Sequence, residues 1–541
     1  MEEDKQWLPH LSSKFVSDAH GHLLDAYAVA LEGWRRGLKL RWHVKDSEKF
    51  KEMTTWFVDK PGQLFSLSSA DKTHYFFRTR GDLVTNEAVA IGRDKEKTKE
   101  VLSKAGIPIP EGKQFTEDVA DEEIINYANA LGYPVVVKPT DGSFGRGVIA
   151  NITSSGELAF SLEYVRSDLG FKDVIVERFV SGDDYRIYVV DDAVVGAIKR
   201  IPANITGDGM NSIKALIELK NEERSLNPRL VSCPIEINQE LADFIGRKGY
   251  TVDTVLEQGE QLILSSKSNI SLGGDPVDVL DELPEQVKTN AVNAIKAVPG
   301  LIHAAVDIMY DENDSSNPAG VVLEINPTAQ LGGILYPVKG ESRDVPAAII
   351  DYYFPETKDI IENKGKVYFD LHDVLDPLNS RQAFITTVTP PPKGKIIAKK
   401  YIVSGEVQDI GYHRGLRKQA FERYLHGFVS NLEDGDIEVV VAGTDEEMVN
   451  DFRNALLEDP ERSHVLDIQE EVYDEPIKVG FDIKADLKTQ LEEMKIILQE
   501  MEVTELALKK AEVQNRKFEQ SLSWRISKPI RVAGALLKKI R

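Results

Sequence analysis

Cysteine, basic charge and long apolar runs are all scarce in this chain. The 541 residues include one cysteine, Cys233, which excludes an intrachain disulfide and fits a reducing compartment. Acidic residues outnumber basic ones by 89 to 66, for a net charge of −23, so no nucleic-acid-binding surface is expected. No run approaches the roughly 20 apolar residues of a membrane span. The start, MEEDKQWLPH, lacks the pattern of a signal peptide. We therefore expect a cytoplasmic protein.

The bulk composition is that of a soluble globular protein, with 42% hydrophobic and 29% charged residues. A chain of this length should hold several domains. Helical and strand-like patterns alternate over most of it, which predicts a multidomain protein of α/β and α+β class. The expected parts are an N-terminal α/β lobe (1–92), a nucleotide-binding domain (93–355), a linker (356–394), a βαββαβ-like unit (395–482) and a helical tail (483–541).

Three oxygen-bearing residues stand on two apolar segments that we expect to form neighbouring strands. Asp307 lies in HAAVDIMY, and Glu324 and Asn326 lie in GVVLEINPTAQLGG. Strand side chains alternate between faces, so the Glu-x-Asn pair projects from one face. Oxygen ligands without His or Cys suit Mg²⁺. Taken alone, the trio would be better explained by ordinary polarity at strand ends.

A lysine and a glycine-rich loop precede these strands. Lys138 ends the strand YPVVVKP, and the loop Gly142-x-x-Gly145-x-Gly147 follows directly. Glycines let successive backbone N–H groups converge on phosphate oxygens, although the spacing is neither that of a Walker loop nor that of a Rossmann fingerprint. Lys95 stands in the helical segment DKEKTKEVLSKAG. A hairpin for the loop and a solvated helix face for Lys95 are the plain alternatives.

The segment VIVERFVSGDDYRIYVV predicts a strand, a loop and a second strand. Backbone groups from Glu177 to Val180 could read the edge of an adenine. Asp184 could accept a hydrogen bond from a ribose hydroxyl. An ordinary hairpin with acidic tips is the alternative reading.

The ordered motifs DKxxTK…GIPxP, VVVKP…GxxGxG, VERFxxGxDxR and VDIM…EIN together resemble the ATP-grasp superfamily of carboxylate–amine ligases. Residues from about 94 to 335 are similar to the ATP-grasp domains of cyanophycin synthetases and bifunctional glutathione synthetases. The supporting segments are KRIPANITGDGMNSIKALI, GYTVDTVLEQGEQLIL and NISLGGDPVDVLDE. The chain lacks the Mur-ligase-like module of the cyanophycin enzymes, so the resemblance does not extend to two-step polymer synthesis.

The resemblance implies a ligase that uses ATP and Mg²⁺, with two ions expected and Mn²⁺ able to substitute. A carboxylate would be activated as an acyl phosphate and joined to an amine of an amino acid, a peptide or a related small molecule. The implied phosphate ligands are Lys95, Lys138, Gly142, Ser143, Gly145 and Gly147. The implied adenosine pocket is Glu177, Arg178, Phe179, Val180 and Asp184. Arg200 would face the acyl phosphate, Asn269 would lie near the phosphates or the acceptor, and Asp307, Glu324 and Asn326 would hold the metal.

Residues 395–482 contain YIVSGEVQDIGYHRGLRKQAF and GFVSNLEDGDIEVVVAG, which resemble acylphosphatase. The family pattern implies that Asn431 orients the attacking water and that the 408–412 loop cradles a phosphate. His413 stands where the family has an arginine, and Asp409 replaces a glycine. The domain could hydrolyse stray acyl phosphate or be a degenerate binder. The alternative for the whole chain is an acylphosphatase with a regulatory ATP-binding region.

The tail after residue 483 carries apolar residues at helical spacing and then changes character. The stripe is Leu487, Leu491, Met494, Leu498, Met501 and Leu508, and it fits a coiled coil or one amphipathic helix. Residues 521–541 are basic and apolar. They could contact an anionic membrane surface, which would make the protein peripheral at the inner membrane, or dock on the acidic body. A homo-oligomer is a further expectation.

Overall fold

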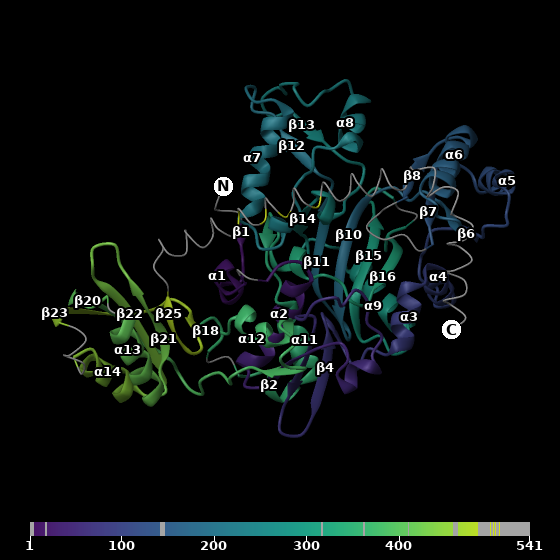
Figure 1. The fold of residues 1–541 in the computed structure, drawn as a ribbon. Helices are drawn as coiled ribbons and strands as arrows, with labels where there is room; N and C mark the ends of the chain where they lie inside the picture. The colour runs from purple at the N-terminus through teal and green to yellow at the C-terminus, as the bar shows by residue number, and fades with distance from the viewer. Residues whose placement is uncertain are drawn as a thin grey trace, which may run out of the picture. The chain divides into compact units, whose positions relative to one another are not determined.

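The computed structural model describes residues 5–16, 19–140, 147–314, 317–360, 363–408, 410–457 and 464–484, together with Leu498, Met501, Thr504 and Leu508. Two compact units result (Figure 1). The first comprises Met1–Ile396 with Glu475–Val479, and the second comprises Ile397–Asp474 with Gly480–Arg541. Both units mix helices and strands, which confirms the predicted α/β and α+β multidomain class.

The N-terminal part of the first unit is built on an antiparallel sheet in the order β19-β2-β3-β4-β5. Its strands are β2 (Lys39–His43), β3 (Leu64–Ser68), β4 (Thr73–Phe77), β5 (Arg80–Gly81) and β19 (Ile385–Thr387). The helices of this part are α1 (Ser13–Val16) and α2 (His22–Arg35), with turns η1 (Pro9–Leu11) and η2 (Glu48–Lys51). From Leu24 to Arg35 every residue of α2 is buried, so this helix is the centre of the largest apolar core.

A smaller antiparallel sheet follows, in the order β6-β9-β7-β8. Its strands are β6 (Gly112–Phe115), β7 (Val135–Pro139), β8 (Ile149–Ile152) and β9 (Val174–Arg178). The helices beside this sheet are α5 (Asp121–Leu131), α6 (Ser155–Leu162) and the π-helical turn η3 (Glu163–Asp168). Helices α3 (Asn86–Arg93) and α4 (Lys95–Lys104) precede it in the chain and contribute to the core of the larger central sheet. Val135 and Val137 of β7 are buried in an apolar core with α5 and α6, while Lys138 falls on the opposite parity of the strand.

The central sheet is antiparallel in the order β14-β11-β10-β15-β16, and Figure 1 shows its strands side by side. Its strands are β10 (Asp183–Val190), β11 (Ala193–Ile201), β14 (Asp275–Asp278), β15 (His303–Tyr310) and β16 (Val321–Asn326). One face packs against α9 (Glu285–Ala297), with Ile187, Val306 and Ile325 in the shared core. Alternation therefore turns the even-numbered residues of β10 and the odd-numbered residues of β15 to the opposite face.

Short elements complete the first unit. They are the hairpin of β12 (Asn204–Thr206) and β13 (Gln261–Ile263), the pair of β1 (Lys5–Gln6) and β17 (Gly340–Glu341), the helices α7 (Ile213–Ser225), α8 (Gln239–Gly246), α10 (Gly332–Leu335) and α11 (Val345–Tyr353), and the turns η4 (Leu230–Ser232), η5 (Ile270–Leu272) and η6 (Pro355–Thr357). Helix α11 packs against α2 and against β10 and β11 of the central sheet.

The segment 356–394, which the sequence suggested as a linker, folds into the first unit. It contributes β18 (Val367–Tyr368), α12 (Leu371–Asn379) and the edge strand β19. Leu371, Leu375 and Leu378 recur at helical spacing in α12 and are buried. Strand β24 (Ile477–Lys478), which follows β23 (His464–Val472) of the second unit in the sequence, belongs to the first unit and pairs in parallel with β18. The apolar stripe of α12 explains why this segment packs.

The second unit has the sheet order β23-β20-β22-β21-β25. Its elements are β20 (Ile397–Glu406), α13 (Ile410–Glu422), β21 (His426–Asn431), β22 (Ile437–Gly443), α14 (Glu446–Ala455), β23 (His464–Val472) and β25 (Phe481–Lys484). The first six are the predicted βαββαβ unit with the strand order 4-1-3-2 of a ferredoxin-like fold. Strand β25 extends the sheet in parallel with β21.

The tail falls mostly beyond the described residues. Leu498, Met501 and Leu508 are described, and their side chains are exposed. Leu487, Leu491 and Met494 of the predicted stripe and the basic segment 521–541 lie outside the described residues. Within the described chain, no helix is both long and apolar enough to span a membrane.

Candidate functional site

Lysines gather at the end of strand β7. Helix α4 begins at Lys95 because Asp94 caps it, accepting from the N–H groups of Glu96 and Lys97. The cap places the Lys95 ammonium 3.2 Å from the carbonyl of Pro139 and 3.4 Å from that of Thr140. The two lysines predicted to bind phosphate therefore both lie at this strand end, since Lys138 directly precedes Pro139.

The carboxylate of Glu177 forms ion pairs with Lys138 and with a third lysine, Lys99 of α4. It is 3% exposed; one oxygen lies 2.6 Å from the ammonium of Lys138, and the other pairs with Lys99. Burial alone would raise the pKa of Glu177, but the ammoniums of Lys138 and Lys99 keep it below its ordinary value. Lys99 was missed by the sequence reasoning, because a lysine on a helix is usually solvated.

The backbone after Glu177 is partly engaged. The N–H of Arg178 donates to the carbonyl of Glu111, and that of Phe179 donates to the carbonyl of Pro134. The guanidinium of Arg178 bonds to the carbonyl of Leu131. Val180 is half-buried in the connection to β10. That the 177–180 segment reads adenine remains a prediction.

The glycine-rich loop is described only at its end. Gly142, Ser143 and Gly145 lie outside the described residues. Gly147 has φ +76°, and a Cβ atom there would lie 2.8 Å from the Pro139 side chain. This position therefore requires glycine, because both the backbone angle and the space exclude a side chain.

Acidic and guanidinium groups alternate across one face of the central sheet. Register pairs Arg186 with Asp307 and Asp307 with Glu324 on three consecutive strands. Both Arg186 contacts to the Asp307 carboxylate are 2.8 Å, which is a bidentate pair. The amide of Asn326 donates to Glu324 at 3.1 Å. The structure thus brings the three predicted metal ligands together and adds Arg186 to them. Arg186 lies two residues after Asp184 on β10, so strand alternation places both side chains on the same face and could have pointed to Arg186 in the sequence.

Arg200 joins this row from β11. Its guanidinium lies 2.5 Å from Asp184 and 3.0 Å from Asp307. Asp184 also accepts a hydrogen bond from the hydroxyl of Ser268. In this structure the carboxylate that we expected to bind ribose therefore bonds to Arg200 and Ser268. Asn269 follows Ser268 and stands at the N-cap position of η5, without a side-chain capping hydrogen bond. The predicted residues Asp184, Arg200 and Asn269 therefore lie in or beside one cluster.

The electrostatics of the row favour an added cation. Burial works to raise the pKa of Asp307, but Arg186 and Arg200 hold it well below its ordinary value. Burial and the charge of Asp307 raise the pKa of Glu324. Two carboxylates that stand opposite each other on neighbouring strands, beside an amide oxygen, are a donor set that a hard divalent ion would fit.

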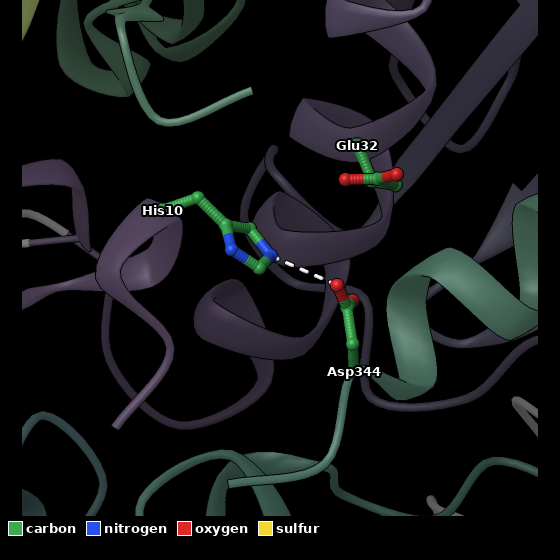
Figure 2. Close-up of side chains that lie close together, drawn as sticks. All are labelled: His10, Glu32 and Asp344. Carbon is green, nitrogen blue, oxygen red and sulfur yellow. Dashed lines mark ion pairs between the residues drawn. The ribbon is translucent and has the colours of Figure 1, made fainter. Parts of the chain in front are cut away.

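A second group of acidic and imidazole side chains includes Glu32 of α2. His10, Glu32 and Asp344 approach one another (Figure 2), and the ring of His10 is 2.9 Å from Asp344. The ammonium of Lys364 is 2.6 Å from Asp344 and 3.5 Å from Glu32. A lysine therefore already supplies the positive charge here, and we interpret this group as a structural ion-pair network.

The second unit places the two predicted acylphosphatase residues on α13 and β21. His413 is 4% exposed. Asn431 ends β21, and its side-chain oxygen is buried without a hydrogen-bond partner among the described residues. Gln408 donates to the carbonyls of Leu432 and Asp436, which fixes the start of the 408–412 loop. Asp409 lies outside the described residues.

The fold and site define the class of domain, and comparison with known proteins supports it. The RimK-like ATP-grasp domain family matches residues 92–226, and the acylphosphatase family matches residues 399–483. Residues 92–226 and 399–483 are therefore similar to these two families, which confirms the resemblance to ATP-grasp ligases and to acylphosphatase that the motifs predicted.

Among curated relatives, cyanophycin synthetase of Synechocystis is 34% identical over 276 residues, covering 49% of this chain and 31% of that protein. The bifunctional glutathione biosynthesis protein of Desulfotalea psychrophila is 30% identical over 301 residues, covering 54% and 38%. The chain spans about a third of the length of these relatives.

Two solved structures are also similar. The bifunctional glutathione synthetase of Pasteurella multocida is 27% identical, with a TM-score of 0.42 over 54% of this chain and 40% of that one. The acylphosphatase of Coxiella burnetii is 28% identical, with a TM-score of 0.16 over 16% and 93%.

Proposed function

We propose that this protein is an ATP-dependent, ADP-forming ligase that activates a carboxylate as an acyl phosphate and joins it to an amine. The main support for this proposal is the row of Arg186, Asp307 and Glu324 on neighbouring strands, with Arg200 beside it. The lysine cluster at the end of β7 supports it, because β9 leads through residues 179–182 directly into β10. A triphosphate bound along this path would contact the ammoniums at the end of β7 and then the metal ligands of the central sheet.

Asp307, Glu324 and Asn326 would hold Mg²⁺, two ions by our proposal, with Mn²⁺ able to substitute. Bound metal would offset the charge that develops on the transferring phosphoryl group. Lys95 and Lys138 would bind the phosphates. Arg200, whose guanidinium stays charged beside Asp184 and Asp307, would stabilise the acyl phosphate oxygens. Arg186 would orient Asp307.

The test is acceptor-dependent ADP release by the full-length protein, screened over pairs of carboxylates and amines with mass detection of the product. We expect release only when both substrates are present. Glu324→Gln and Lys138→Met should abolish it, whereas the exposed Lys97→Met on the same helix as Lys95 should not. Wild-type turnover in Glu324→Gln would contradict the site assignment.

A second activity is suggested by the side-chain oxygen of Asn431, which is buried and has no hydrogen-bond partner among the described residues. We propose that the second unit binds an acyl phosphate and that His413, which cannot clamp a phosphate bidentately, leaves its hydrolysis slow. Benzoyl phosphate hydrolysis without ATP is the assay. Gain of activity in His413→Arg, lost again in His413→Arg with Asn431→Ala, is expected. No gain would show that the unit does not act on acyl phosphates.

Cytoplasmic location, contact of residues 521–541 with a membrane surface and homo-oligomerisation remain predictions. Flotation with anionic liposomes, with and without residues 521–541, tests the second. Sedimentation of the full-length protein tests the third. Equal flotation of both forms would exclude a membrane role for the segment.

A further inference from the structure

The edge strand β19 leaves part of its backbone without a strand partner. It pairs with β2 on one side, and no strand in the described part of the chain pairs with its other side. The N–H of Val44 donates to the carbonyl of Phe384 at 3.1 Å. The N–H of Val388 donates to the carbonyl of Leu40 at 3.0 Å. The stretch paired with β2 therefore runs from residue 384 to residue 388.

Two residues of this stretch offer main-chain groups to a further strand. Hydrogen-bonded pairs alternate along an antiparallel ladder, so Ile385 and Thr387 direct their N–H and C=O groups away from β2. No backbone group of a turn or loop among the described residues bonds to either of them. Proteins usually protect such an edge with a charged residue, a proline or a bulge. The segment FITTVT (384–389) contains no charge and no proline, and its register with β2 is unbroken.

A cavity of about 340 Å³ lies beside this edge. Residues 386–389, the first turns of α12 and residues 478–479 line it, and all of them belong to the first unit. Its volume is at the lower end of the roughly 300–1,000 Å³ of ligand sites, so it can hold one long side chain. The hydroxyl of Thr386 is buried without a hydrogen-bond partner among the described residues. A polar group is therefore available in the lining.

The charges of the cavity favour a cation. Asp370 and Asp373 of α12 share one ammonium, that of Lys478, at 3.3 and 3.1 Å. Two carboxylates therefore face one cation, and the side chain of Asp373 is 66% exposed. Val374 and Val479 add apolar surface to the lining, which suits the methylene stem of a basic side chain. A lysine or arginine side chain thus matches the cavity in charge and in length.

Neither family match accounts for this cavity. Its lining residues between 369 and 389 lie outside both matched segments, 92–226 and 399–483. It contains none of the residues assigned to nucleotide, metal or acyl phosphate. Its ligand is therefore independent of the two proposed activities.

We propose that β19 and this cavity form a docking site for an extended peptide segment of a partner protein. The segment adds to the sheet as a strand and places a lysine or arginine side chain beside Asp370 and Asp373. Main-chain hydrogen bonds with Ile385 and Thr387 supply affinity, and the cavity selects the basic side chain. The added strand also covers Ile385, which is 45% exposed. The proposal does not depend on the ligase function.

The test measures binding of labelled seven-residue peptides to the full-length protein by fluorescence polarisation. The peptides are acetylated and amidated, alternate threonine with valine, and carry arginine, lysine, norleucine or glutamate at the central position. We expect the arginine and lysine peptides to bind at least about 10-fold more tightly than the norleucine peptide, and the glutamate peptide to bind most weakly. Equal binding of the arginine and glutamate peptides would overturn the proposal, as would no binding by any peptide of the panel.

Amide hydrogen exchange, resolved to single residues, shows whether a strand is added. Saturation with the arginine peptide should slow exchange at Ile385 and Thr387 at least about 10-fold, because their N–H groups gain acceptors. Exchange at Thr386, which already pairs with β2, should change little. Unchanged exchange at Ile385 and Thr387 would overturn strand addition. N-acetylarginine amide that binds as tightly as the peptide would do the same, because the cavity would then act alone.

Variants assign the contacts to residues. Thr387→Pro removes an outward N–H, a position where an edge strand tolerates proline, and should weaken every peptide at least about 10-fold. Asp373→Asn should lower the preference for arginine over norleucine about 10-fold, whereas the exposed Asp376→Asn on the same helix should not. Lys478→Met should strengthen the arginine peptide several-fold, because both carboxylates are then left to the ligand. Thermal unfolding confirms that each variant is folded. Wild-type binding in both Thr387→Pro and Asp373→Asn would refute the site.

A second copy of this chain is the competing occupant of the edge. Sedimentation of the full-length protein and of Thr387→Pro over a range of concentrations distinguishes the two. We expect the two proteins to sediment alike. Self-association that Thr387→Pro abolishes would show that the edge pairs with another copy, and it would overturn the peptide proposal.

Discussion

The stability of variants at Glu177 should depend on how many opposite charges remain beside one another at this site. Its buried carboxylate faces the ammoniums of Lys138 and Lys99. Removing the charge with Glu177→Gln leaves two buried cations close together. Breaking a buried ion pair by removing one partner costs about 3–5 kcal/mol, and we expect a loss of this size in the free energy of unfolding.

Removing one lysine should be milder, because the triad then has one cation and one anion. We expect Lys99→Met to cost about 1.5–3 kcal/mol, the contribution of one charged hydrogen bond. The double variant Glu177→Gln with Lys99→Met leaves a single cation. It should therefore be more stable than Glu177→Gln alone, although it carries one substitution more.

Lys99→Met should also weaken ATP binding. With Lys99 gone, the whole charge of Glu177 acts on Lys138, which then leaves the carboxylate less readily for a phosphate. Urea unfolding followed by tryptophan fluorescence reports stability, because Trp7, Trp34, Trp42 and Trp56 all lie in the first unit. Fluorescent-nucleotide titration reports ATP affinity. A double variant less stable than Glu177→Gln would refute the charge-balance argument.

Three further results are expected. Arg186→Lys should lower kcat about 10- to 100-fold with little change in ATP affinity, because lysine cannot reproduce the bidentate bond to Asp307; an unchanged kcat would contradict this role. Gly147→Ala should raise the KM for ATP and destabilise the protein by about 1–3 kcal/mol, given φ +76° and a Cβ 2.8 Å from Pro139, whereas Gly156→Ala, with open space at its Cβ, should not. Burial and then Arg41 lower the pKa of His43 to about 4, so the fold holds it neutral and acid favours the unfolded state. His43 should contribute a fall in stability of about 2 kcal/mol at pH 5 as the pH drops from about 6.5 towards 4. His43→Gln should remove this part of the slope in urea unfolding, and the part due to buried His303, whose pKa burial lowers to about 3, should remain.

The strand-borne part of the site was predictable because strand geometry is local. Asp307 and Glu324 stand directly opposite each other, as two acidic residues on consecutive apolar segments suggest. Arg186 follows Asp184 by two residues and obeys the same rule, yet its pairing with Asp307 depends on a strand more than a hundred residues away. Lys99 could not be chosen among the lysines of α4, since its burial arises from contact with Glu177 on β9. The apolar stripe of α12 was visible in the sequence. The sequence did not indicate that the following segment would form β19, the edge strand that pairs with β2.

The two clusters have opposite charge imbalance, and this explains how one ligand could satisfy both. At the end of β7 three ammoniums, those of Lys95, Lys99 and Lys138, lie among two carboxylates: Glu177 pairs with Lys99 and Lys138, and Glu96 lies 3.9 Å from Lys99. On the central sheet the carboxylates outnumber the guanidiniums, and the raised pKa of Glu324 shows that a further negative charge there is disfavoured. A metal-bound triphosphate offers anionic oxygens to the first cluster and cations to the second. Free nucleotide would satisfy only the lysines and free metal only the carboxylates, so each should increase the affinity for the other.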